Sequence, residues 1–194
     1  GYGQFGAIEE LTEEQARRQI ETNLFGPLWV TKAVVALLRE QRSGHIIQVS
    51  SIGGVTAFPI LGIYHASKWG LEGFSQALAA ELAEFGVHVT IVEPGGFTTD
   101  WSGDSAGRAP DMPAYDGVRE RRLRALGPVR TQPGDPQATG AAILALVDAP
   151  APPLRVFFGS TALQIARREY ASRIEAWEEW DWLAQVAQGT KGPV

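Results

Sequence analysis

The chain has 194 residues, no cysteine and a formal net charge of −5 at pH 7, with 44% hydrophobic and 20% charged residues. This length and composition fit one globular domain, residues 1–194, and the acidic balance argues against a nucleic-acid partner. No apolar run reaches the roughly 18 residues of a membrane span, so we expect no membrane partner. The lack of cysteine excludes disulfides and thiolate chemistry and suits a cytoplasmic protein.

The first six residues, Gly1 to Gly6, contain the letters G-x-G-x-x-G of a dinucleotide-binding turn. That motif needs a strand before it and a helix directly after it. No strand precedes Gly1, and the next helix signal is the capping box Thr12-Glu13-Glu14-Gln15. We therefore interpret the opening residues as a flexible loop near the functional site.

Helix and strand signals then alternate, as in a parallel α/β fold. A helix is expected from Thr12 to about Gln41, with a disturbance at Gly26-Pro27, and buried strands are expected over 45–50 and 87–92. Later patterns predict a helix over 135–147, a strand over 154–158 and a long helix from Thr161 onward. The late aromatics there keep helical spacing, so we interpret them as packing residues: Trp177, Trp180 and Trp182.

The helix that begins near Tyr64 carries two different faces. Apolar residues recur at three- and four-residue steps and predict a core face: Leu71, Phe74, Leu78, Leu82 and Phe85. A second stripe consists of small residues, against which a neighbouring helix or sheet could pack closely: Gly70, Gly73, Ala77 and Ala80.

Tyr64 and Lys68 carry the clearest chemical signal in the sequence. A free tyrosine ionises near pH 10 and is a poor base at neutral pH. A lysine four residues later lies on the same helix face, where its charge can lower the pKa of the phenol. Ser51, at the end of the predicted strand over 45–50, could hydrogen-bond the substrate oxygen whose proton Tyr64 gives or takes. The pattern predicts acid–base chemistry on a carbinol or carbonyl.

Four separate motifs appear in the order and at the spacing of one family. They are Asn23 within Thr22-Asn23-Leu24-Phe25-Gly26, Ser51 within Val49-Ser50-Ser51, Tyr64-x-x-x-Lys68, and Pro94-Gly95-Gly96-Phe97-Thr98-Thr99. On these residues the chain resembles the short-chain dehydrogenase/reductase family along nearly its whole length. The neighbourhood of Pro94 is similar to the branch that includes 17β-hydroxysteroid-type dehydrogenases.

The resemblance implies a Rossmann-type doubly wound parallel sheet, of which this chain holds the C-terminal part: the last three strands and their helices. Gly1 would correspond to the last residue of the family's Asn-Asn-Ala-Gly stretch. The strand and glycine-rich turn that cradle the cofactor pyrophosphate would then be missing from the N-terminal side. A further strand is expected beside residues 45–50.

The resemblance also implies catalytic roles for Tyr64 as general acid/base, Lys68 as the group that lowers its pKa and holds the nicotinamide ribose, Ser51 on the substrate oxygen, and Asn23 as anchor of a water relay to the lysine. The cofactor is NADP or NAD, with NADP slightly favoured. The expected cofactor-binding residues are Gly1, Tyr64, Lys68, Pro94, Gly95, Phe97 and Thr99.

Residues 100–136 correspond to the family's variable substrate loop, and a loop of this length is usually functional. Its arginines have two readings, a solvated helix face or contact with an anionic substrate group or cofactor phosphate: Arg119, Arg121, Arg122 and Arg124. Several apolar residues suggest that the small-molecule alcohol or carbonyl substrate has an apolar body: Phe58, Ile60, Leu61, Trp101 and Met112.

The predicted function is therefore an NAD(P)-dependent oxidoreductase that interconverts a secondary alcohol and a ketone or aldehyde, assembled as a homodimer or homotetramer. Two alternatives stay open: an epimerase or dehydratase of the extended relatives, which would need a longer C-terminal domain, and a truncated, catalytically silent interaction module. No metal site is expected, because His45, His65 and His88 lack ligand spacing.

Overall fold

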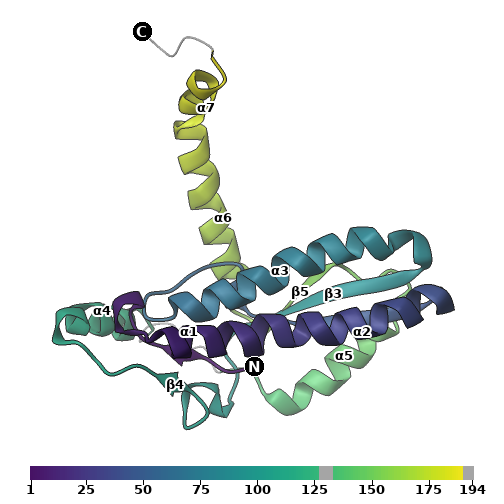
Figure 1. Ribbon diagram of the computed structural model, residues 1–194, viewed down its shortest axis with the longest axis horizontal. Helices are drawn as coiled ribbons and strands as arrows, with labels where there is room; N and C mark the ends of the chain where they lie inside the picture. The colour runs from purple at the N-terminus through teal and green to yellow at the C-terminus, as the bar shows by residue number, and fades with distance from the viewer. Residues whose placement is uncertain (127–132, 190–194) are drawn as a thin grey trace.

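The computed structural model describes residues 1–126 and 133–189. Figure 1 shows α3 on one side of a parallel sheet and α5 on the other. The strands are β1 (Gln4–Phe5), β2 (Gly44–Val49), β3 (Val87–Pro94), β4 (Gly107–Arg108) and β5 (Arg155–Phe158). The helices are α1 (Glu13–Ile20), α2 (Gly26–Gln41), α3 (Gly62–Leu82), α4 (Asp116–Leu126), α5 (Thr139–Val147), α6 (Ala162–Glu179) and α7 (Asp181–Ala187).

The main sheet consists of three parallel strands in the order β2-β3-β5. Gly44 pairs with Val87 at one end of β2 and Val49 with Val92 at the other, while Ile91 pairs with Arg155. The three predicted strands are thus confirmed, each within two residues of its expected ends. All their carboxyl ends lie at one edge of the sheet, which is where ligands bind in open α/β folds.

A second, two-stranded sheet joins the start of the chain to the substrate loop. β1 pairs in parallel with β4, with Gln4 opposite Gly107. The G-x-G-x-x-G letters therefore form no cofactor turn, but the expectation of a flexible loop is wrong: residues 3–7 are buried, and the Gln4 N–H donates to Gln19 Oε1 at 2.7 Å. Two residues are too few for periodicity to predict a strand.

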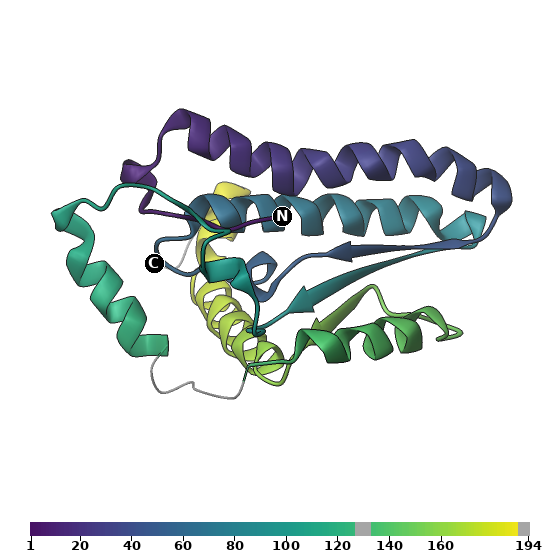
Figure 2. The same cartoon turned by 90° about the horizontal axis from the view of Figure 1, so that it is seen from below.

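The core lies between α3 and β3. Leu71, Leu78 and Leu82 of the predicted face are buried, and Ile91 on β3 is fully enclosed. Figure 2 shows α1 and α2 running beside α3 along one side of the strands. This arrangement fixes the first turns of α3, which carry Tyr64 and Lys68, beside the end of β2.

The long N-terminal helix is interrupted earlier than expected. A π-helical turn over Glu21–Phe25 separates α1 from α2, and the Gly26 N–H donates to the Glu21 carbonyl five residues back. Pro27 has no N–H to donate to the carbonyl of Asn23, which favours this wide turn. Such turns are frequent at functional sites, and this one contains Asn23.

The C-terminal helices leave the body of the protein, as Figure 1 shows for α6 and α7. The predicted helix from Thr161 is confirmed as α6, but the interpretation of the late tryptophans as packing residues is wrong. Trp177 is 64% exposed and Trp180 is 55% exposed. Trp180 stacks on Trp182, with 5.8 Å between ring centroids. Among helices of residues 1–126 and 133–189, none combines the length and apolar character needed to cross a bilayer.

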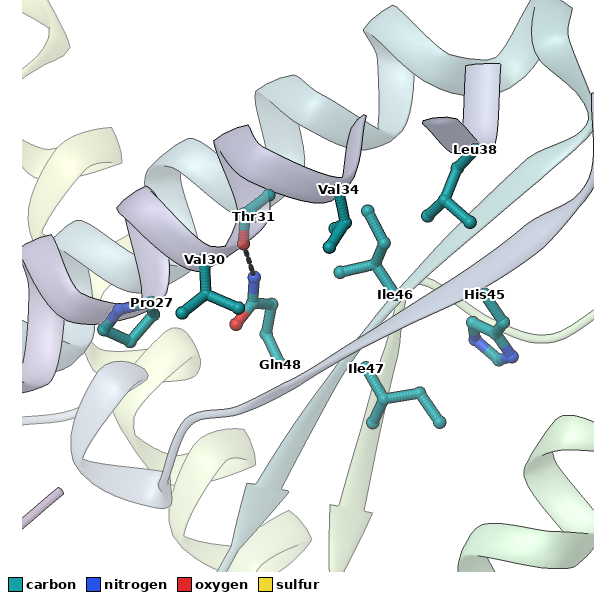
Figure 3. A pocket seen from close by; sticks show the side chains of 9 residues that line it. All are labelled: Pro27, Val30, Thr31, Val34, Leu38, His45, Ile46, Ile47 and Gln48. Atoms are coloured by element: carbon teal, nitrogen blue, oxygen red, sulfur yellow. Dashed lines mark hydrogen bonds between the residues drawn. The ribbon is translucent and has the colours of Figure 1, made fainter. Parts of the chain in front are cut away.

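No strand of the described residues pairs with the edge of the main sheet beside α2. β2 is the outer strand there, and a groove of about 510 Å³ runs between it and α2, lined by Val30, Val34 and Ile46 among others (Figure 3). Gln48 Nε2 donates to Thr31 Oγ1 across it at 2.7 Å. Val30 is 67% exposed. An unpaired strand edge next to apolar side chains is where the resemblance implies a further strand.

Candidate active site

Asn23 is held inside the structure by the start of the chain. Its side chain is 1% exposed. The Asn23 amide donates to the Tyr2 carbonyl at 2.9 Å and to Ser67 Oγ at 3.3 Å, and its Oδ1 accepts from the Tyr2 N–H at 3.1 Å. Ser67 Oγ in turn donates to the Tyr64 carbonyl at 2.6 Å. The chain Tyr2–Asn23–Ser67 therefore ties the π turn to the helix that carries Tyr64.

Ser51 and Tyr64 lie together at the carboxyl end of β2. Ser51 has an extended backbone and its Oγ accepts from the Gly53 N–H at 3.0 Å, which fixes the side chain. Burial raises the pKa of Tyr64, and a hydrogen bond with the Ser51 hydroxyl opposes that rise. A buried phenol beside a hydroxyl can hold one carbonyl or carbinol oxygen between them.

Lys68 lies one helical turn beyond Tyr64 and is 8% exposed. Its Nζ donates to the Val49 carbonyl at the end of β2 at 2.9 Å. Burial lowers the pKa of Lys68 to about 8, while the charge of Glu72 acts in the opposite direction. The ammonium group is therefore held at the strand end rather than in solvent.

Gly1 completes this side of the site. A Cβ atom at Gly1 would lie 2.6 Å from Asn23 Oδ1, so the backbone passes directly over the asparagine. A side-chain-free backbone at this position is a cradle that fits a close ligand contact.

The segment after β3 is fixed by backbone contacts. The Gly95 N–H donates to the Phe158 carbonyl at 2.8 Å, and the Thr98 N–H donates to the Gly134 carbonyl at 3.0 Å. Thr99 caps a short 3₁₀ turn by accepting from the Trp101 N–H at 3.4 Å. Pro94, Gly95, Phe97 and Thr99 thus lie beyond the carboxyl end of β3, next to the strand end that carries Ser51.

An apolar cluster covers Tyr64. Phe5, Leu61 and Tyr64 are buried together, and the Trp101 ring lies 5.1 Å from the Tyr64 ring and 5.3 Å from the Phe5 ring. Ile60, which packs on this cluster, has φ of 69°, a strained value for a β-branched residue. The Gly6 N–H donates to its carbonyl at 3.0 Å and holds it there. Ile60, Leu61 and Trp101 were expected here; Phe5 was not.

Two other predicted pocket residues lie differently. Phe58 packs on His65 edge to face at 5.6 Å, and the Phe58 N–H donates to His65 Nε2 at 2.9 Å. His65 Nδ1 is 2.9 Å from the Gly53 carbonyl, so this histidine fixes the loop before α3. Met112 is partly exposed, at 37%, and lies outside the Tyr64 cluster.

The arginines of the substrate loop divide into different roles. They lie on α4, a helix inside the loop that extends to residue 136, and part of that loop falls outside the described residues. Arg124 pairs with Glu120 at 2.9 Å on the solvent side. Arg119 pairs with buried Glu10, which also accepts from the Met112 N–H at 2.7 Å. Arg119 therefore fastens the loop to the start of the chain.

Arg121 and Arg122 bear on the second reading of these arginines, which is contact with an anionic substrate group or cofactor phosphate. Arg122 lies over the Phe5 ring at 5.5 Å, and Arg108 lies over the same ring at 4.8 Å. Arg121 is exposed. The solvated-face reading therefore describes Arg121 and Arg124, while contact of Arg122 with an anionic group stays a prediction.

Sequence reasoning missed a buried charged cluster beneath the site. Glu72 on α3 and Glu93 on β3 are 6% and 1% exposed. Arg155 on β5 reaches both, with Nε at 3.2 Å from Glu72 Oε2 and 3.4 Å from Glu93 Oε1. The available signals were a glutamate at the end of an apolar strand and another two turns after Tyr64.

The sequence of this chain is similar to a known protein family and to curated proteins. The family described as short chain dehydrogenase matches residues 1–108. Oxidoreductase BOA17 of Botryotinia fuckeliana is 35% identical over 189 residues, covering 95% of this chain and 68% of the relative. A 3-ketodihydrosphingosine reductase of Bacteroides thetaiotaomicron is 38% identical over 162 residues, covering 82% of this chain and 60% of the relative.

Two solved structures are also similar. A short-chain dehydrogenase from Streptomyces avermitilis has a TM-score of 0.83 at 35% identity and covers 98% of this chain and 68% of its own. A short-chain dehydrogenase from Burkholderia cenocepacia in complex with NADP has a TM-score of 0.68 at 25% identity, covering 92% and 66%. The chain belongs to the short-chain dehydrogenase family of oxidoreductases, and it spans 60% and 68% of the length of the two curated relatives above.

Proposed function

We propose that the whole protein is an NAD(P)-dependent oxidoreductase that interconverts a secondary alcohol and a ketone or aldehyde. The observation that carries this proposal is the buried Tyr64 phenol beside Ser51 at the carboxyl end of β2, with the Lys68 ammonium one turn further along α3. We further propose that residues 1–194 form one domain and that the protein is cytoplasmic.

The residues around this end of the sheet fit the nicotinamide end of a cofactor. Lys68 would hold the ribose, the backbone at Gly1 would allow close contact, and the segment after β3 would border the ring through Pro94, Gly95, Phe97 and Thr99, beside Tyr64. A bound nicotinamide supplies hydride chemistry. The NADP complex of the Burkholderia cenocepacia relative supports NADP slightly over NAD.

The proton step belongs to Tyr64. Because burial raises the pKa of Tyr64, the phenol keeps its proton at neutral pH and is suited to donate it to a carbonyl oxygen, that is, to reduction. Ser51 would orient that oxygen. Lys68 would favour the phenolate left behind, and Asn23 would anchor a water relay to Lys68. In the oxidative direction Tyr64 takes the hydroxyl proton, which requires a higher pH.

We infer an apolar body for the substrate. Trp101 and Phe5 cover Tyr64, and this surface favours hydrocarbon over charge. The Bacteroides relative is named for 3-ketodihydrosphingosine, which supports a ketone with an apolar chain. The similarity to the 17β-hydroxysteroid-dehydrogenase branch stays a prediction.

The proposed activity is tested by incubating the whole protein with NADPH or NADH and a series of ketones and aldehydes of increasing apolar size. We expect the absorbance of the reduced cofactor to fall only when a carbonyl compound is present, and faster with larger apolar groups. No turnover of any substrate with either cofactor would favour the silent interaction module instead.

Assembly yields a separate prediction. The Thr12 helix and the Tyr64 helix are proposed to form the interface of a homodimer or homotetramer, since the stripe of Gly70, Gly73, Ala77 and Ala80 leaves α3 open to close packing. Three of these residues are exposed, and a Cβ at Gly73 would meet no atom of the described residues within 4 Å. Ala77→Trp should therefore shift the mass measured by light scattering towards the monomer. An unchanged mass would place the interface elsewhere.

A further inference from the structure

Three ionisable residues follow one another along a single face of α3. Tyr64, Lys68 and Glu72 are spaced by four residues, so each lies one turn beyond the last. All three are buried, with exposures of 6%, 8% and 6%. The site lysine therefore lies between the phenol on one side and a buried carboxyl group on the other.

The Glu72 carboxyl group is held by two other strands of the sheet. Arg155 on β5 contacts it through Nε at 3.2 Å, and Arg155 is itself fixed by Gln76 Oε1 at 2.9 Å. Glu93, the residue before Pro94 on β3, lies beside Glu72 and is 3.4 Å from the same Arg155 Nε. The cluster thus links α3, β3 and β5 directly beneath the segment that begins at Pro94.

Two carboxylate oxygens of this cluster have no hydrogen-bond partner in the described part of the chain. Oε1 of Glu72 and Oε1 of Glu93 are both buried and accept no hydrogen bond from the described residues, although Arg155 Nε lies 3.4 Å from Glu93 Oε1. Gly54 covers one side of Glu72 Oε1, because a Cβ atom added at Gly54 would lie 2.9 Å from that oxygen. Two carboxylates can only accept hydrogen bonds, whereas a protonated carboxyl group can donate one. A proton on Glu93 would supply the donor that the Glu72 carboxylate lacks.

We propose that Glu72 is a positioning residue that keeps the Lys68 ammonium protonated in the site, and that neutral Glu93 donates a hydrogen bond that holds the Glu72 carboxylate in place. The value of this to catalysis rests on the proposed function, in which Lys68 needs its charge to hold the ribose and to favour the Tyr64 phenolate. The Glu72 carboxylate then balances Lys68 and Arg155 from one buried position.

The charged groups around Lys68 agree with this assignment. Glu72 on α3 opposes the effect of burial, which lowers the pKa of Lys68 to about 8. On the far side of Glu72, burial and the Glu72 charge raise the pKa of Glu93 to about 8, and Arg155 opposes them. Glu93 therefore stays protonated at neutral pH.

The test is a direct titration of Lys68. The chain has three lysines, Lys32, Lys68 and Lys191, so protein labelled with ¹³C at the lysine ε-carbon shows few signals, and Lys68→Ala assigns the one of interest. In the wild type we expect a titration midpoint near 8. Glu72→Gln should move that midpoint at least about half a pH unit lower. Glu93→Gln, the matched control, keeps a donor to Glu72 and should leave it unchanged.

An unchanged midpoint in folded Glu72→Gln protein, or an equal fall in Glu93→Gln, would overturn the proposal. If circular dichroism shows that Glu72→Gln does not fold, Arg155→Gln decides instead. That variant removes the cation that competes for the same carboxylate, so the Lys68 midpoint should rise; no change or a fall would contradict the assignment. A merely structural role predicts no such pair of opposite shifts.

The outcome is independent of whether the proposed reaction is correct. A Lys68 midpoint that responds as expected, in a protein that turns over no carbonyl compound, would remove the proposed function and leave the electrostatic link intact. If carbonyl reduction depended on Tyr64 but the Lys68 midpoint were the same with and without Glu72, the proposed function would stand and the electrostatic link would be removed.

Discussion

Tyr64→Phe should lower kcat of the whole protein at least about 100-fold, because positioned proton transfer typically contributes that much or more. The change removes one hydroxyl group and leaves the ring packed between Leu61 and Trp101, so the fold and the affinity for cofactor should stay close to those of the wild type. Steady-state kinetics and cofactor titration on the same preparation measure both.

Tyr170→Phe is the matched control for this experiment. Tyr170 lies on α6, far along the chain from the site, and is 48% exposed. The substitution removes the same hydroxyl group, and we expect no change in rate. If Tyr64→Phe protein reduced ketones at the wild-type rate from about pH 6 to about pH 9, the assignment of the proton step would be wrong.

Glu93→Gln should make the protein more stable than the wild type at pH 8 but not at pH 5. In the wild type, burial raises the pKa of Glu93 from 4.5 to about 8, so the folded state holds a proton that the unfolded chain releases. The stability due to this proton is complete below pH 4.5 and is lost as the pH rises towards 8. Glutamine resembles the protonated acid at every pH and removes this loss.

The expected difference between the two pH values is on the order of 2 to 4 kcal/mol in the free energy of unfolding. Urea unfolding of both proteins at pH 5 and pH 8 measures it, and the comparison cancels the effects of other groups such as the buried His65. A stability difference between variant and wild type that is the same at both pH values would mean that Glu93 is ionised in the folded protein.

Local spacing explains what the sequence could predict. The three strands of the main sheet appear as short apolar runs, and the Tyr64 helix has an apolar face at helical steps, because each of these patterns arises within one element. Tyr64 and Lys68 could be placed on one face for the same reason. The family motifs then indicated that Asn23 and Ser51 lie nearby, and the structure places Asn23 against Ser67 and Ser51 against Tyr64.

The remainder depends on contacts between distant segments. Glu72, Glu93 and Arg155 come from three elements, and nothing in the spacing of any one of them indicates that they meet. Phe5 reaches Trp101 only because the short strand β1 pairs with β4. The exposed Trp177 has the spacing of a packing residue, but α6 extends beyond the body, so no neighbouring element in the described part of the chain covers it.

The central claim, that these residues serve hydride transfer to a carbonyl carbon, is tested most directly by isotope transfer. The whole protein is given NADPH or NADH carrying deuterium at both C4 positions of the nicotinamide together with a ketone, and the alcohol product is analysed by mass spectrometry and NMR. We predict one deuterium on the carbinol carbon of the product with wild-type protein, and a product yield reduced at least about 100-fold with Tyr64→Phe. An alcohol product without deuterium at that carbon, or no product with either cofactor, would contradict the account.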